Sequence, residues 1–180
     1  MRIKDIKRHL KVYSIMGGRE TTINHAFASA LASNDYYDER IIIKAIKMLG
    51  QNPDKDLFCV YCGKLAETWD HVVGLVKNHN FSGHGHVIGN LVPCCRKCNA
   101  EKGNKNWQDF IVKLPRFVDR SKILSKYFKK YLPIITDYNY IKKICPNEIK
   151  EFDSKKEQIF KLMKEADNIA TKIRKIIYKK

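Results

Sequence analysis

The sequence predicts a mixed α+β fold, in which a cysteine-rich central module (residues 57–107) lies between an N-terminal and a C-terminal basic helical region (residues 1–56 and 108–180). Cys, His, Gly and Trp cluster in the centre, and helical periodicity fades there. Both flanks carry apolar residues at the spacing of amphipathic helices. Hydrophobic residues make up 44% of the chain and charged residues 30%, so the chain can bury a core and is not disordered by composition.

Two helices are expected in the N-terminal region, after a basic arm (residues 1–18) that ends at a pair of glycines. The first helix covers residues 21–33, where apolar side chains recur at four-residue spacing. Asn34 or Asp35 then caps a second helix, because the side-chain oxygens of both residue types accept hydrogen bonds from the first backbone N–H groups. That helix ends before Gly50, which stands where a left-handed C-terminal residue belongs.

The C-terminal region returns to helical spacing after the central module, and its last helix is expected to begin at Ser154, which starts a capping box with Glu157. One face of that helix carries apolar residues, namely Phe160, Met163, Ala166, Ala170, Ile173 and Ile177. A basic and aromatic stretch precedes it (residues 116–142). Two interpretations of this stretch stay open: contact with the backbone of a nucleic acid, or a solvated charged face.

The chain has 35 Lys and Arg against 19 Asp and Glu, a formal net charge of +16. Such an excess costs self-repulsion in the folded state, which a polyanionic partner relieves. A nucleic acid is the first candidate and an anionic membrane surface the second, although biased genome composition can also raise the lysine count. The apolar runs are far shorter than the roughly 20 residues that cross a bilayer, and no apolar segment follows the charged N-terminus. We therefore expect a cytoplasmic protein without a membrane partner.

Two C-x-x-C pairs bracket much of the central module: Cys59 with Cys62, and Cys95 with Cys98. Disulfides are disfavoured in a reduced cytoplasm, so these thiols need another role. Together they can offer four thiolates to one tetrahedral zinc ion, and we expect one structural zinc ion per chain. Four thiolates leave no open coordination position, so this ion would take no part in chemistry. Buried, inert cysteines or a redox pair are the alternatives.

Two further cysteines remain. Cys94 lies beside Cys95 and competes with it as a ligand, but the two-residue gap to Cys98 favours Cys95. We expect Cys94 and Cys145 to be small buried hydrophobic residues, which is the commonest role of a free cysteine in a protein interior.

Polar residues with the chemistry of hydrolysis stand between and just after the two pairs. They are Asp70 and His71, then Asn90 in Gly-Asn-Leu, then Asn99 directly after the last cysteine. The order C-x-x-C, D-H, N-L, C-x-x-C-N-x-x-K-G resembles the zinc-bearing four-cysteine branch of the HNH endonucleases, over residues 57–107. The resemblance implies a ββα-metal core and a metal-dependent DNA endonuclease, which is a phosphodiester hydrolase.

The same residues make chemical sense without the family. Hydrolysis of a phosphodiester needs an activated water, charge neutralisation and help for the leaving oxygen, and a hard divalent cation supplies the last two. Asp70 and the amide oxygen of Asn99 suit Mg²⁺ or another such cation. His71 suits the role of base, because an imidazole titrates near neutral pH. Asp70 and His71 are adjacent, so they share one site only if the strand ends or bends there, or if the cation and the base approach from different sides.

The resemblance implies further roles. Asn90 would brace the loop between the strands and orient the histidine, and Asn99 would link the zinc site to the catalytic cation. Taken singly, an Asp–His pair is usually a surface turn, and both asparagines would commonly be turn or cap residues. The loop residue His86 is a candidate phosphate or metal contact, because it is the loop histidine nearest to Asn90.

Three residues that follow the second cysteine pair also have expected roles. Lys102 and Lys105 are expected to pair with phosphates, and Trp107 is expected to pack in the core.

Within the nuclease class we expect a type II restriction enzyme that cuts double-stranded DNA. One such centre cuts one strand, so this role predicts a homodimer. Homing, phage and structure-specific nucleases share the same core, and fold-level analogy alone separates them. A zinc-containing module that binds DNA without catalysis is the alternative from another class, and a protein-interaction zinc domain is a third that the positive charge disfavours.

Overall fold

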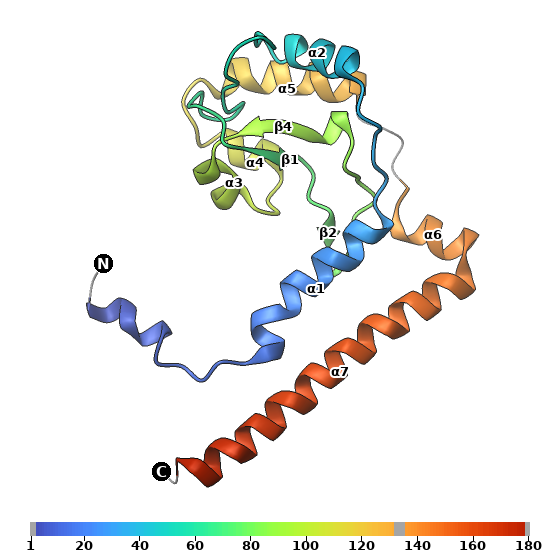
Figure 1. The fold of residues 1–180 in the computed structure, drawn as a ribbon. Coiled ribbons are helices and arrows are strands. Elements are labelled where there is room, and N and C mark those ends of the chain that lie inside the picture. The colour runs from blue at the N-terminus through green and yellow to red at the C-terminus, as the bar shows by residue number, and fades with distance from the viewer. Residues whose placement is uncertain (1–2, 132–135, 179–180) are drawn as a thin grey trace.

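The structure is a computed structural model that describes residues 3–131 and 136–178. A central module with helices packed over it forms one part of the molecule, and a pair of long helices extends away from it (Figure 1). The mixed α+β class predicted from the sequence is confirmed. In chain order the elements are η1 (Ile3–Arg8), α1 (Ile15–Leu31), α2 (Glu39–Met48), β1 (Thr68–His71), β2 (Val76–Lys77), β3 (Asn80–Phe81), η2 (Ile88–Asn90), β4 (Leu91–Cys94), α3 (Arg96–Lys102), α4 (Trp107–Ile111), α5 (Phe117–Tyr131), α6 (Tyr138–Ile144) and α7 (Pro146–Ile177).

The strands form two small antiparallel sheets. In one of them β1 pairs with β4, and Asp70 lies opposite Val92 while His71 lies opposite Leu91. The helix α3 follows β4 directly and packs against β1. The short hairpin β2–β3 lies in the segment between β1 and β4. Two strands and a helix therefore bring residues from both ends of the central module together.

The main core lies between this sheet and the helices α2, α4 and α5. Tyr61, Val92 and Ile111 are fully buried in it, and each such apolar side chain contributes about 1.5–3 kcal/mol relative to an exposed one. Trp107 is 8% exposed and belongs to the same core, which confirms its predicted place. Residues from both flanking regions thus complete the core of the central module.

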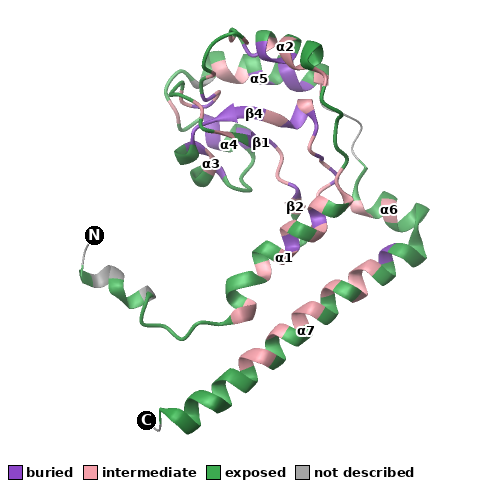
Figure 2. Ribbon diagram, viewed as in Figure 1, coloured by how far each residue is buried: buried purple, intermediate pink, exposed green. Residues whose placement is uncertain are grey.

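The helices α1 and α7 pack against each other, and α1 also packs on the β2–β3 hairpin, while the C-terminal part of α7 extends away from the central module (Figure 1). The rings of Phe27 and Phe152 meet with centroids 4.8 Å apart. The predicted apolar face of the last helix is only partly covered: Phe160 and Met163 are half-buried, whereas residues 168–178 are exposed (Figure 2). No described helix is long and apolar enough to span a membrane.

The first long helix begins earlier than predicted. α1 starts at Ile15 rather than residue 21, so the paired glycines lie inside it and do not end the arm. The Asp167 carboxylate accepts hydrogen bonds from the backbone N–H groups of Ile15 and Met16, at 2.7 and 3.1 Å. The Ser14 hydroxyl accepts a third, from the N–H group of Gly17. A contact from α7 thus satisfies the helix terminus, and local sequence carries no sign of it.

The predicted caps of the other helices have mixed outcomes. Gly50 has a φ of +76° just after α2, as predicted. The cap at Asn34 or Asp35 is wrong, because α2 begins after Asp38, whose side chain accepts the N–H group of Arg40.

Asn34 and Asp35 instead contact the loop that contains His86 and Ile88. Asn34 forms a β-bridge with His86, and the Asp35 carboxylate accepts the N–H group of Ile88. The capping box at Ser154 is wrong too, because α7 begins at Pro146 and passes through it.

Candidate functional site

Four cysteines gather at one point of the central module. The sulfur atoms of Cys59, Cys62, Cys95 and Cys98 all lie within 4.8 Å of one another. The first two stand in the turn before β1, and the other two begin α3. Ligands about 2.3 Å from a central zinc ion form a tetrahedron whose edges measure about 3.8 Å. The Cys62 and Cys95 sulfur atoms are 3.6 Å apart, so the cluster fits a tetrahedral ion of this kind.

The two remaining cysteines differ in burial. Cys94 is fully buried, as predicted, and its sulfur lies 3.9 Å from that of Cys59 but outside the four-cysteine group. Cys145 is exposed, and the prediction that it is buried is wrong because it stands at the junction of α6 and α7, away from any core. Burial raises the pKa of Cys62 and of Cys98. These two thiols need a bound cation to stay ionised, whereas the hydrogen bond with Cys94 already lowers the pKa of Cys59.

A second cluster of polar residues lines a cavity of about 530 Å³ beside the cysteines. Asp70, His71, His86 and Asn99 all contribute to its wall. They come from β1, from the loop before η2, and from α3. Four of the residues singled out in the sequence therefore share one cavity.

Asp70 lies at the base of this cavity, and it is 4% exposed. The Tyr61 hydroxyl donates a hydrogen bond to its carboxylate at 2.6 Å, and the Lys102 ammonium lies 3.0 Å from the same oxygen. Burial raises the pKa of Asp70, and these two neighbours oppose the rise. The Lys102 ammonium also donates to the backbone oxygen of His71 at 2.9 Å. Lys102 is fully buried, so the prediction that it pairs with phosphates is wrong.

His71 and His86 form a pair. The Nε2 atom of His71 and the Nδ1 atom of His86 are 2.9 Å apart, so one of them donates to the other. Burial, reinforced by the charges of His86 and Lys102, lowers the pKa of His71 to about 4. His71 is therefore neutral at pH 7. In the tautomer that donates from Nε2, its Nδ1 atom has a free lone pair that can take a proton from water.

Asn90 does not line the cavity but ties the loop beside it. Its side chain accepts the N–H group of Val73 at 2.8 Å and donates to the backbone oxygens of Val73 and Gly85, at 3.0 and 3.1 Å. The residue is fully buried. These bonds hold the chain just after His71 to the chain just before His86. Asn90 therefore braces this loop through its side-chain amide.

Asn99 connects the two clusters. It lies in the first turn of α3, next to Cys98, and its backbone N–H group donates to the oxygen of Cys95. Its side chain lines the cavity that Asp70 lines. Among the described residues, no side-chain hydrogen bond engages the Asn99 amide. The cysteine cluster thus fixes the turn that places Asn99 at the edge of the cavity, where its amide has no side-chain partner among the described residues.

Asp70 and Asn99 are the predicted residues in the cavity whose oxygen atoms could bind a hard divalent cation. An ionised carboxylate has about four lone-pair sites, and the contacts to Tyr61 and Lys102 use three of those on Asp70. Roughly one lone-pair site of the Asp70 carboxylate remains for a cation, and the Asn99 amide adds a second oxygen ligand. Magnesium is often bound through one or two protein oxygens plus water and phosphate, so these residues fit it as a small set.

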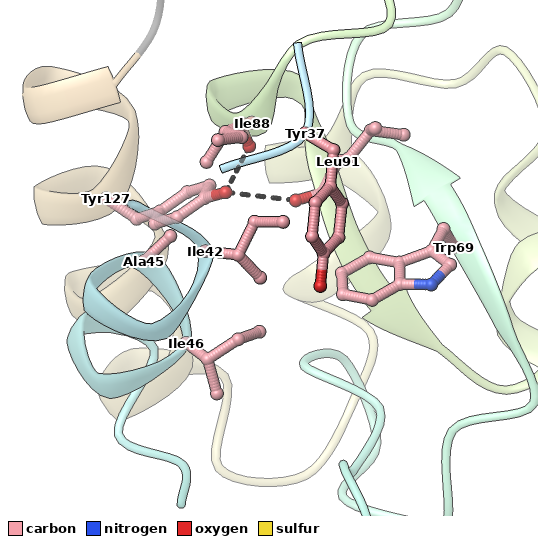
Figure 3. Close-up of a pocket in the computed structure, with 8 residues that line it drawn as sticks. All are labelled: Tyr37, Ile42, Ala45, Ile46, Trp69, Ile88, Leu91 and Tyr127. Atoms are coloured by element: carbon pink, nitrogen blue, oxygen red, sulfur yellow. Dashed lines mark hydrogen bonds between the residues drawn. The ribbon is translucent and has the colours of Figure 1, made fainter. Parts of the chain in front are cut away.

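An apolar pocket of about 280 Å³ adjoins the cavity, and Trp69 lines both. In Figure 3 the rings of Tyr37 and Trp69 face Ile42 and Ile46 across it. The Tyr127 hydroxyl is already used, since it donates to the backbone oxygens of Ile88 and Leu91 (Figure 3). The pocket therefore offers mainly apolar contact.

Sequence reasoning missed several residues of the site. Tyr61 stands inside the first C-x-x-C pair, which is the only signal that it lies close to the cluster. The helix α1 supplies Thr21, His25 and Ser29 to the cavity wall, and no motif marks these three. Comparison of the chain with protein-family models, with curated proteins and with solved structures gave no match.

Proposed function

We propose that this protein is a metal-dependent HNH endonuclease that hydrolyses phosphodiester bonds in DNA. The observation that carries the proposal is the single cavity lined by Asp70, His71 and Asn99 beside a four-cysteine cluster. A neutral imidazole, a carboxylate and a free amide oxygen are what metal-assisted hydrolysis requires. The formal net charge of +16 suits a polyanionic substrate.

In this proposal His71 takes the proton of the attacking water, for which its lowered pKa keeps it neutral. A divalent cation bound by Asp70 and Asn99 would neutralise charge on the phosphate and on the leaving oxygen. Asn90 positions His71 by tying the chain just after it to the chain just before His86. Zinc in the cysteine cluster would hold α3, and with it Asn99, against β1.

The biological role proposed within this class is that of a type II restriction enzyme that acts as a homodimer. Two copies are needed because one site of this kind cuts one strand. This finer proposal rests on analogy between small nucleases of similar construction. It predicts discrete fragments from plasmid or phage DNA.

The first experiment incubates purified protein with plasmid DNA in Mg²⁺, beside the His71→Ala variant. Loss of the base is expected to lower the cleavage rate about 10²–10⁴-fold. The control is His84→Gln, which changes a histidine of the same loop that lines a different cavity. EDTA should abolish cleavage and added Mg²⁺ should restore it. Zinc content is measured after that treatment, so that loss of the structural ion is not mistaken for loss of the catalytic one.

Discrete fragments that vanish in His71→Ala would support the restriction role, and a smear that vanishes would support the nuclease alone. Cleavage that survives in His71→Ala would overturn the assignment of the base. Absence of cleavage by the wild type in Mg²⁺ and in Mn²⁺, together with tight DNA binding, would overturn the nuclease.

A second candidate is a zinc-containing module that binds DNA without cutting it. The observation that favours it is the buried pair between Asp70 and Lys102, whose Nζ atom lies 3.0 Å from a carboxylate oxygen. An ammonium in this place reduces the attraction of the carboxylate for a cation. The experiment above separates the two candidates.

A further inference from the structure

The cavity has a second wall that comes from outside the central module. Thr21, His25 and Ser29 of α1 line it opposite the residues of β1 and α3. They stand four residues apart, so they lie one above another along the helix. With a rise of about 1.5 Å per residue, this row of side chains is about 12 Å long. It faces the position that the proposed function gives to the scissile bond.

The faces of α1 beside and behind this row are occupied by packing. Asn24 and Ala28 are buried, and the ring of Phe27 meets that of Phe152 on α7. Asn24 also lies 3.3 Å from a ring nitrogen of His79, in the turn between β2 and β3. Packing on that side explains the presence of α1 beside the module but assigns no role to the row that faces the cavity.

The row carries hydrogen-bonding groups that the rest of the chain leaves unused. Two hydroxyl groups and one imidazole are present, and each can donate to an anionic oxygen. Among the described residues, no side-chain hydrogen bond engages Thr21, His25 or Ser29. Half of a typical protein–DNA interface consists of such contacts to phosphate and sugar, many of them from Ser, Thr and other polar side chains.

We propose that Thr21, His25 and Ser29 of α1 bind the phosphate backbone of the DNA strand beside the bond that is cut. This inference rests on the proposed function for its substrate and goes beyond it by naming the surface that holds that substrate. A strand in B-form DNA advances about 3.4 Å per nucleotide, so a row of about 12 Å spans roughly three nucleotides. The α1 wall, defined by these three residues, sets where the strand lies, and the β1 and α3 residues act on it.

The test measures binding and cleavage separately. A fluorescently labelled DNA duplex is titrated in the absence of Mg²⁺ by anisotropy, and cleavage of the same duplex is timed in Mg²⁺. The variants are Thr21→Val, Ser29→Ala and His25→Ala, each checked by its melting temperature. The matched control is Thr22→Val, which changes the neighbouring exposed threonine that does not line the cavity.

We expect His25→Ala to weaken binding about tenfold, and Thr21→Val or Ser29→Ala about threefold to fivefold, as for the loss of one hydrogen bond. The cleavage rate at saturating DNA should change much less than KM. Binding by all three variants that equals that of Thr22→Val would overturn the proposal. So would a fall in the saturated rate with no change in KM.

A second measurement locates the contact on the DNA. Single methylphosphonate linkages remove the charge of one phosphate at a time, and the loss of affinity is compared between wild type and His25→Ala. At a phosphate that His25 contacts, the neutral linkage should lower the affinity of the wild type but should lower that of His25→Ala little further. If the two losses add at every position, His25 contacts none of the phosphates.

Because binding is read without cleavage, a wild type that binds but never cuts would refute the proposed nuclease and leave this test valid.

Discussion

The central module and the α1–α7 pair are held together in different ways. In the module, the cysteine cluster joins the turn before β1 to the start of α3, and the Asp70–Lys102 pair is buried beneath it. The α1–α7 pair packs along its length, with one aromatic contact and a few hydrogen bonds to Asp167, and α1 adds a small apolar cluster with the β2–β3 hairpin through Ala28, whereas the far end of α7 is exposed. The residues proposed for chemistry thus lie on the tightly connected part. The proposed DNA-binding wall lies on the more loosely held part.

The largest effect is expected when the cysteine cluster is opened. Cys98→Ser is expected to lose the metal and to unfold the module, because binding of structural zinc contributes on the order of 10–16 kcal/mol in small zinc domains. Elemental analysis should show one zinc ion per wild-type chain and none in the variant, and circular dichroism should show the loss of structure. The control is Cys145→Ser, which changes an exposed cysteine far from the cluster. A variant that folds normally without zinc would refute the structural role.

The next largest effect is expected at the buried ion pair. Lys102→Met leaves the Asp70 carboxylate buried without its cation, and loss of one partner of such a pair costs about 3–5 kcal/mol. The destabilisation should shrink as the pH falls, because a protonated Asp70 no longer carries an uncompensated charge. Urea unfolding at several pH values measures both effects. Lys105→Met is the matched control, since its ammonium donates to the exposed backbone oxygen of Glu101 and to nothing else in the described part of the chain. Equal stability of Lys102→Met and wild type would show that the pair contributes nothing.

The contrast between the two parts also explains what the sequence could predict. The four cysteines and Gly50 were predictable because each belongs to a short local pattern with a clear physical meaning. The start of α1 was not, because it depends on Asp167, which lies far along the chain. The burial of Lys102 was missed for a related reason: a lysine after a helix turn is usually solvated, and only the position of Asp70 makes it a core residue.

A smaller effect is expected where α7 holds the start of α1. Hydrogen bonds from the N–H groups of Ile15 and Met16 and from the Ser14 hydroxyl lower the pKa of Asp167. Its stabilising contribution is therefore present above the unfolded-state value of about 3.9 and is lost as the pH falls through the lower folded-state value. The protection of the amides in the first turn of α1, measured relative to their unstructured exchange rates at the same pH, should therefore fall at low pH in the wild type.

The variant Asp167→Asn should show faster exchange in this turn already at neutral pH, because it lacks the charge. Glu165→Gln serves as the control, since its carboxylate is exposed and lies 4.0 Å from the ammonium of Lys161 on the same helix. Exchange in α1 that is equally slow in Asp167→Asn and wild type would show that the aromatic contact alone holds the two helices.

The smallest effect is expected from shortening α7. A chain that ends at Asn168 removes Ile169, Ile173 and Ile177, which continue the apolar face of the helix but are exposed in the monomer. Loss of exposed residues usually changes stability by no more than about 0.5 kcal/mol, so the melting temperature should stay nearly constant. A lower melting temperature of the shortened chain, together with a wild-type melting temperature that itself falls on dilution, would contradict this expectation. It would mean that a second copy of the chain covers these isoleucines, and the loosely held part of the monomer would then be a firmly held part of a dimer.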